Sequence, residues 1–124
     1  MRYRWFVAGA LLLGLSRTAA AEDVVWANAV GVSVSGSSLT KTGGTGWNAG
    51  AGSTGVIRFG YGYVEFTATE TTTYRICGLG NTDSDQNYTD VDFGIIVRSD
   101  GSFGVYEAGT HRGDFGINGV RRFG

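Results

Sequence analysis

The sequence predicts an all-β fold, an antiparallel β-sandwich built from two sheets. Three observations predict it. Apolar and polar residues alternate with period two from Tyr63 to Ala68 and again from Val91 to Val97. No segment shows the i, i+3, i+4, i+7 spacing of an amphipathic helix. Glycine occurs 22 times and proline is absent, and glycines set among Thr, Val, Tyr and Phe indicate short strands joined by tight turns.

The first 21 residues have the features of a secretory signal peptide. Arg2 and Arg4 form a basic start, residues 5–15 form an apolar run, and residues 19–21 end in an Ala-x-Ala cleavage pattern. The apolar run is shorter than the ~20 residues of a membrane-spanning helix, so cleavage is favoured over an uncleaved anchor. We therefore expect residues 22–124 to form one domain, secreted or held in the cell envelope, with no membrane span after cleavage.

The charge and the rare residue types exclude several classes of function. Without the leader, which contains Arg2, Arg4 and Arg17, the chain has 7 basic and 11 acidic residues, a net charge of −4. Nucleic acid is not an expected partner, because phosphate binding needs a basic surface. The only cysteine is Cys77 and the only histidine is His111. Internal disulfides are thus excluded, and Ser-His-Asp or Cys-His catalysis and transition-metal sites are poorly supplied.

The N-terminal half of the mature chain predicts short strands separated by glycine-rich turns. Residues 24–26 and 30–34 are expected to be extended, and residues 39–42 return after the break at residues 35–38 to form a hairpin. Residues 46–53 have no clear period and are small side chains around Trp47. Residues 56–59 predict another short strand.

The C-terminal half carries the clearest alternation. Val64, Phe66 and Ala68 are expected on one face of a strand, and residues 73–77 form the next, in which Cys77 is a half-buried residue. Residues 91–97 and 103–107 form a second hairpin around a tight turn at residues 99–102. His111 and Arg112 are interpreted as a solvated turn or a site for an acidic group.

Aromatic side chains supply the candidate ligand-binding residues. Pyranose rings pack on aromatic faces, and Trp47, Tyr61 and Tyr63 stand in or beside glycine-rich segments. We interpret these three residues as a candidate sugar-stacking set. The alternative for Trp47 is a place in the core of the sandwich.

The polar loop that follows the predicted strand at residues 73–77 supplies a candidate calcium site. Asn81, Asp83, Asp85 and Asn87 place oxygen-bearing side chains at alternate positions. Calcium takes six to eight oxygen ligands, and alternation in a loop lets several side chains point at one centre. The glycine of a helix-loop-helix calcium loop is replaced by Gln86. The alternative is a solvated turn in which these side chains bond to their own backbone.

Paired carboxylates give a remote catalytic alternative. Asp90 and Asp92 are expected on one strand face, with Glu65 on a neighbouring strand. A glycosidase needs one carboxyl group to protonate the leaving oxygen and another as nucleophile or base. The alternative, two acids on a polar strand face, is favoured, so we do not expect an enzyme.

Six short motifs follow one another along the chain: Val30-Gly-Val-Ser-Val-Ser-Gly with Leu39-Thr-Lys-Thr, Gly46-Trp47-Asn48-Ala49-Gly50, Gly62-Tyr-Val-Glu-Phe-Thr-Ala, Tyr74-Arg75 with Gly78-Leu79, Asp90-Val-Asp-Phe, and Val105-Tyr106-Glu107. In this order they resemble a module of large secreted and surface proteins of bacteria, related to the concanavalin A-like lectins and glucanases and to SPRY-type sandwiches. The resemblance covers residues 25–116 and implies a jelly-roll-like sandwich used for carbohydrate or protein recognition.

Two departures from that family matter. Its modules continue beyond the position of Gly116 with further strands, whereas this sequence ends after eight more residues, which indicates a truncated or frame-shifted copy. The glucanase branch carries a Glu-x-Asp-x-x-Glu strand, and the corresponding Asp90-Val-Asp-Phe-Gly-Ile lacks both glutamates. We therefore expect a non-catalytic extracellular module that binds carbohydrate or another surface polymer. A protein-interaction domain without a small ligand is the alternative, and a glycoside hydrolase the remote one.

Overall fold

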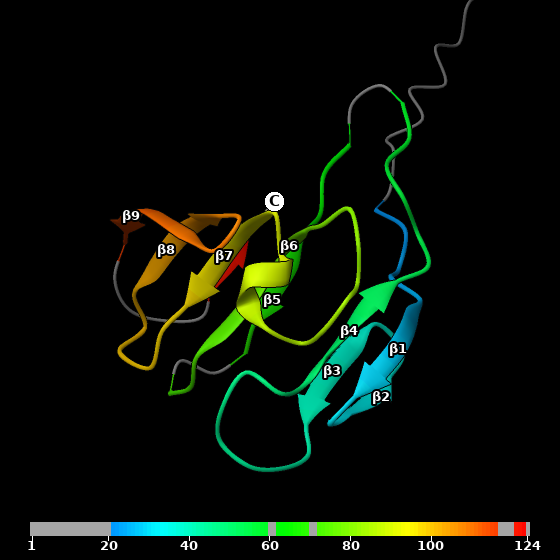
Figure 1. The fold of residues 1–124 in the computed structure, drawn as a ribbon, viewed down its shortest axis with the longest axis horizontal. Coiled ribbons are helices and arrows are strands. Elements are labelled where there is room, and N and C mark those ends of the chain that lie inside the picture. The colour runs from blue at the N-terminus through cyan, green and yellow to red at the C-terminus, as the bar shows by residue number, and fades with distance from the viewer. Residues whose placement is uncertain (1–20, 60–61, 70–71, 117–120, 124) are drawn as a thin grey trace, which may run out of the picture.

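The computed structural model describes residues 21–59, 62–69, 72–116 and 121–123 (Figure 1). Every strand pairing among them is antiparallel, so the predicted all-β antiparallel class is confirmed. One short 3-10 helix, η1 (Tyr88–Asp90), interrupts the strands. The strands are β1 (Trp26–Val30), β2 (Val32–Ser35), β3 (Ser38–Lys41), β4 (Gly50–Ser53), β5 (Phe66–Ala68), β6 (Arg75–Leu79), β7 (Phe93–Val97), β8 (Phe103–Glu107), β9 (Thr110–Phe115) and β10 (Arg121–Phe123).

The strands of the described residues form four small sheets that do not close on one another. One sheet has four strands in the order β6-β7-β8-β9, and the pairs β1–β4, β2–β3 and β5–β10 make three two-stranded sheets. Figure 1 shows the four-stranded sheet and β1 to β4 at opposite sides of the molecule, with η1 and its loop between them. No helix in the described ranges is both long and apolar enough to cross a membrane.

The two predicted hairpins are confirmed. Strands β2 and β3 pair from Val32↔Lys41 to Ser35↔Ser38, and Gly36 in their turn has the positive φ of 57° that glycine tolerates best. Strands β7 and β8 pair from Val97↔Phe103 to Phe93↔Glu107. Alternation of apolar residues is a reliable strand signal where the two runs are joined by a short turn, and both hairpins meet that condition.

Strand β9 is a difference from the sequence-based expectation, which put His111 and Arg112 in a turn. The chain reverses at Ala108 and Gly109, which both have positive φ, and returns as β9 against β8. Such a two-residue turn fits the twist of a hairpin. The strand was missed because its residues are polar and exposed, as on the edge of a sheet, and show no apolar alternation.

Residues 56–59 also differ from the expectation, because they do not form a strand. Within the described residues no strand pairs with this segment, and Phe59 is 94% exposed. A short apolar run can be extended only if a neighbour accepts its backbone hydrogen bonds. Residues 63–68 likewise form a strand only over Phe66–Ala68, which pairs with β10.

The four-stranded sheet has two unlike faces, because residues directly opposite each other in register share a face. The apolar face is defined here by three cross-strand rows, and the glycine face by the residues that alternate with them. The apolar face consists of Arg75, Val97, Phe103 and Phe115, then Cys77, Ile95, Val105 and Gly113, then Leu79, Phe93 and Glu107. The glycine face consists of Ile76, Ile96, Gly104 and Asp114, then Gly78, Gly94, Tyr106 and His111.

Candidate functional site

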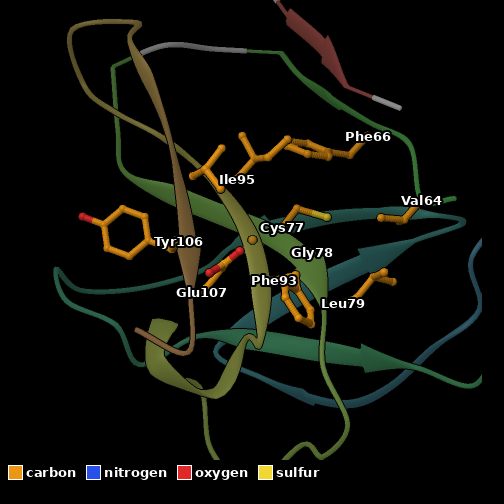
Figure 2. A pocket seen from close by; sticks show the side chains of 11 residues that line it. Val64, Phe66, Cys77, Gly78, Leu79, Phe93, Ile95, Tyr106 and Glu107 are labelled. Atoms are coloured by element: carbon orange, nitrogen blue, oxygen red, sulfur yellow. The ribbon is translucent and has the colours of Figure 1, made fainter. Parts of the chain in front are cut away.

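A pocket of about 320 Å³ lies on the apolar face. Figure 2 shows Phe66 beside Ile95 at one side of it and Phe93 beside Leu79 at another, while Tyr106 points away. Successive side chains of a strand point to opposite faces of the sheet, so the side chain of every second residue of β6, β7 and β8 faces this space. The side chains that define the apolar pocket are Val64, Phe66, Cys77, Leu79, Phe93, Ile95, Val105 and Glu107.

Burial falls steeply along this face. On β7, Val97 is 1% exposed, whereas Phe93, four residues away on the same face, is 61% exposed. Leu79, directly opposite Phe93, is 43% exposed. Large apolar side chains that water contacts beside an apolar hollow are a typical feature of a binding surface.

Glu107 is the only acidic side chain of the pocket lining. It stands directly across from Phe93 in register, and its Oε2 accepts a hydrogen bond from Nε of Arg112 at 2.8 Å. Arg112 is the extra residue of a register shift in β9, between Gly113 opposite Val105 and His111 opposite Tyr106. A bulge of this kind re-aims a side chain, which is why Arg112 reaches Glu107.

Cys77 lies on β6 within this pocket, half-buried as predicted. Burial raises the pKa of its thiol, and a hydrogen bond with the backbone of Gly78 partly offsets that effect. A raised pKa keeps the sulfur protonated at neutral pH, so Cys77 acts as a small apolar residue of the lining and not as a nucleophile.

An aromatic row crosses from the N-terminal half of the chain to the glycine face. The ring of Trp47 lies 5.3 Å from that of Tyr88 in η1, Tyr88 lies 5.8 Å from Tyr106 on β8, and Tyr106 lies 5.3 Å from His111 on β9. The rings are tilted or edge-to-face, the arrangement that aromatic quadrupoles favour. The row therefore packs the loop of Trp47 against the sheet.

The row ends in a shared carboxylate on the glycine face. One oxygen of Asp114 lies 2.6 Å from Nη2 of Arg98 and 2.7 Å from Nε2 of His111. The hydrogen bond from His111, followed by the one from Arg98, lowers the pKa of Asp114. Gly104 makes room for this pair, since a Cβ there would lie 2.8 Å from the same carboxylate oxygen.

The three predicted sugar-stacking residues do not form one platform in the described residues. Trp47 is half-buried in the aromatic row, and Tyr63 is exposed. Both line a second, wider cleft of about 2680 Å³, which β4, β6 and the loop after β6 also line. Tyr61 lies outside the described residues.

The four predicted calcium ligands each have a different protein partner. Oδ2 of Asp83 accepts a hydrogen bond from Asn28 at 2.9 Å, and Oδ1 of Asp85 accepts one from the backbone of Asn87 at 2.7 Å. Asn87 caps η1 by accepting from the backbone of Thr89. Asn81 donates from its side-chain amide to Asp92 at 3.0 Å.

This bonding pattern matches the alternative in which the loop side chains bond to backbone and neighbours. Across the described ranges, no three or more His, Cys, Asp or Glu side chains are grouped to hold a metal ion. Calcium binding by Asn81, Asp83, Asp85 and Asn87 stays a prediction.

The paired carboxylates are not on one strand, which corrects that expectation. Asp90 belongs to η1, and β7 begins at Phe93, after Asp92. The hydroxyl and the backbone N–H of Ser84 donate hydrogen bonds to Asp90 and lower its pKa. A carboxyl group held in its ionised form is a poor proton donor, so this arrangement does not favour an acid catalyst.

The sequence missed two parts of the site. It identified the shared face of Phe93, Ile95 and Val97, but not that the Phe93 end is uncovered, because periodicity reports a face and not what covers it. It also missed Tyr88 and Tyr106 as partners of Trp47. In the sequence, the only sign of these contacts is that Tyr88 and Tyr106 are aromatic residues flanking the predicted strand at residues 91–97.

Comparisons with known protein families, with curated proteins and with solved structures found no match for this chain.

Proposed function

We propose that this protein is a non-catalytic binding domain whose apolar pocket receives an apolar side chain of a polypeptide partner. The observation that supports it is the exposure of Phe93 and Leu79, 61% and 43%, at the edge of a pocket of about 320 Å³. An apolar anchor that fills such a hollow removes both side chains from water.

The lining chemistry favours a polypeptide anchor over a polar ligand. Seven of the eight lining side chains are apolar or sulfur-containing, and Glu107 is the exception. Sugars need several fixed polar groups beside an aromatic plane, and this pocket offers one carboxylate. The domain acts in this proposal outside the cell, as its leader sequence predicts, and the resemblance to concanavalin A-like modules agrees with a recognition role.

The test compares two exposed phenylalanines, Phe93 in the pocket lining and Phe59 outside it. Peptides are selected from a displayed random library on the wild-type protein, and their affinities are measured by fluorescence polarisation. Phe93→Ala is expected to weaken binding at least tenfold, because an anchor contact of a few kcal/mol is lost. Phe59→Ala removes an equally large and more exposed ring outside the pocket, and should change nothing.

Two results would contradict the proposal. Peptides that bind Phe93→Ala as well as wild type would put the binding surface elsewhere. Failure to select any peptide over repeated rounds, with a cooperatively folded protein, would argue against a polypeptide partner.

Carbohydrate binding is the second candidate, and one observation favours it. Trp47 and Tyr63 open onto the same cleft of about 2680 Å³, a space wide enough for an extended oligosaccharide. A glycan array probed with wild type, Tyr63→Ala and Tyr74→Ala tests it, because both tyrosines line that cleft but only Tyr63 of the two belongs to the predicted sugar-stacking set. Signal lost in Tyr63→Ala alone would support sugar stacking, and an array without signal would argue against it.

A further inference from the structure

We infer that the apolar side chain received by the pocket is followed or preceded in its polypeptide by a cationic residue, and that Glu107 binds this cation. The inference rests on the proposed function and adds to it the charge of the partner.

Glu107 is placed to reach the residue beside an anchor in the pocket. Glu107 lies directly opposite Phe93 in the β7–β8 register, and side chains so paired have Cβ atoms ~5 Å apart. When an anchor side chain of the partner packs on Phe93, the next residue of the partner polypeptide therefore comes within reach of the Glu107 carboxylate. Figure 2 shows Glu107 among the side chains that line the pocket.

The Glu107 carboxylate has a cationic partner in the folded chain. Glu107 already binds a guanidinium, that of Arg112, through Oε2 and Nε at 2.8 Å. Both side chains are about half exposed, 44% and 54%, so the pair is open to exchange with a cation from solution. The contact joins Nε of Arg112 to Oε2 of Glu107, which leaves the other carboxylate oxygen as an acceptor for a second donor.

The charge of the pocket lining favours a cation over an anion. Among the described residues that line the pocket, Glu107 is the one carboxylate and none is Lys or Arg. The cation that binds Glu107 in the folded chain is Arg112, outside the lining, so a partner cation has to displace Arg112 or share the carboxylate with it. An anionic neighbour would meet no cation of the lining, and the nearby guanidinium of Arg112 is already paired with Glu107. The mature sequence, with its net charge of −4, adds a weak attraction of the same sign.

The experiment measures amide shifts of ¹⁵N-labelled protein during titration with three capped dipeptides. Acetyl-Phe-Arg amide carries anchor and cation, acetyl-Phe-Gln amide the anchor alone, and acetyl-Ala-Arg amide the cation alone. At low salt the first is expected to bind about threefold more tightly than the second, the ratio that an exposed ion pair supplies. The preference should decline as salt is added.

Two variants make the result specific. Glu107→Gln keeps the shape of the side chain and should abolish the preference for acetyl-Phe-Arg amide while leaving acetyl-Phe-Gln amide unchanged. Arg112→Gln removes the internal competitor and should raise the affinity for acetyl-Phe-Arg amide about twofold. The reverse change, weaker binding in Arg112→Gln, would overturn the inference.

The outcomes separate the inference from the function on which it rests. Equal affinity for both Phe dipeptides, in wild type and in Glu107→Gln, overturns the inference and leaves the apolar anchor site intact. Absence of shifts at Leu79, Phe93 and Ile95 with any Phe dipeptide overturns the anchor site, and the inference falls with it. Equal shifts with acetyl-Ala-Arg amide would mean that charge alone drives binding. That result would contradict the anchor site and the inference that rests on it.

Discussion

The two ends of the apolar face have similar residues and opposite environments. Val97 is almost completely buried, and Phe93, on the same strand and the same face, is more exposed than buried. Phe93 is the larger apolar residue, so hydrophobicity did not decide which of them is covered. Position on the sheet decided it, since a side chain is buried only where another segment lies over it.

The apolar face of this sheet therefore has a buried end and an exposed end, and the two ends contribute differently to stability. The Val97 end contributes to the free energy of folding, because its burial is complete in the folded chain. The Phe93 end contributes little to folding, because most of the Phe93 side chain stays in water. Substitutions that change one property without the other can therefore break or sharpen the comparison.

The largest effect is expected at the buried end. Val97→Ala removes two methyl groups from a site without access to water, and we expect the free energy of unfolding to fall by about 2 kcal/mol. Urea unfolding followed by circular dichroism measures it. A change below about 0.5 kcal/mol would mean that Val97 is not part of a packed core.

An intermediate effect is expected at Phe115, at the edge of the same row. Its ring stacks on Phe103 at 6.1 Å with planes 28° apart, but half of the residue is exposed. Phe115→Ala should lower the free energy of unfolding by about 1 kcal/mol, while Phe115→Tyr, which keeps the ring, should have little effect. Equal losses in the two variants would exclude the stacking contact as the cause.

A small effect on stability is expected at the exposed end. Phe93→Ala should change the free energy of unfolding by less than about 0.5 kcal/mol, because most of the side chain is already in water. The same urea experiment provides the number. If Phe93→Ala destabilised the protein as much as Val97→Ala, the two ends would not differ and the exposed end would belong to the core.

The smallest effect on stability is expected on the glycine face, where the contribution of Asp114 should depend on pH. Hydrogen bonds from His111 and then Arg98 lower the pKa of Asp114 below its ordinary value of 3.8. A depressed carboxyl pKa stabilises the folded state above pH 3.8, and that stabilisation is lost as the pH falls through the lower folded-state pKa. Unfolding midpoints of wild type and Asp114→Asn, measured from pH 7 to pH 2, should therefore converge at the acidic end.

A difference between wild type and Asp114→Asn that persisted at pH 2 would show that the substitution acts through packing and not through charge. The matched control is Asp23→Asn, an exposed acid near the N-terminal end of the described chain. It should leave the midpoints close to wild type at every pH.

The sequence predicted local structure better than packing. Both hairpins, β2–β3 and β7–β8, follow from local alternation and turn residues, because their outermost pairs, Val32↔Lys41 and Phe93↔Glu107, are close in the sequence. Strand β4 was missed, because Gly50–Ser53 carries only small residues and becomes a strand through its pairing with β1, more than twenty residues earlier. A local sequence pattern does not show which distant segment a strand will pair with.

The site was predicted only in part for the same reason. Trp47 was recognised as a candidate, but its contact with Tyr88 joins two loops far apart in the sequence. The pocket depends on Val64 and Phe66 lying over the sheet formed by β6, β7 and β8. The alternation of residues 63–68 indicated a buried side without indicating what lies against it.

The register shift in β9 has a consequence for how copies of the protein behave at high concentration. His111, Arg112 and Asp114 place both signs of charge on the last strand of the sheet, and the extra residue bends that strand. A bent, charged margin is a poor template for a further strand of another molecule. Fibrillar self-assembly by lateral growth of this sheet is therefore disfavoured at β9, even though the face beside it is apolar.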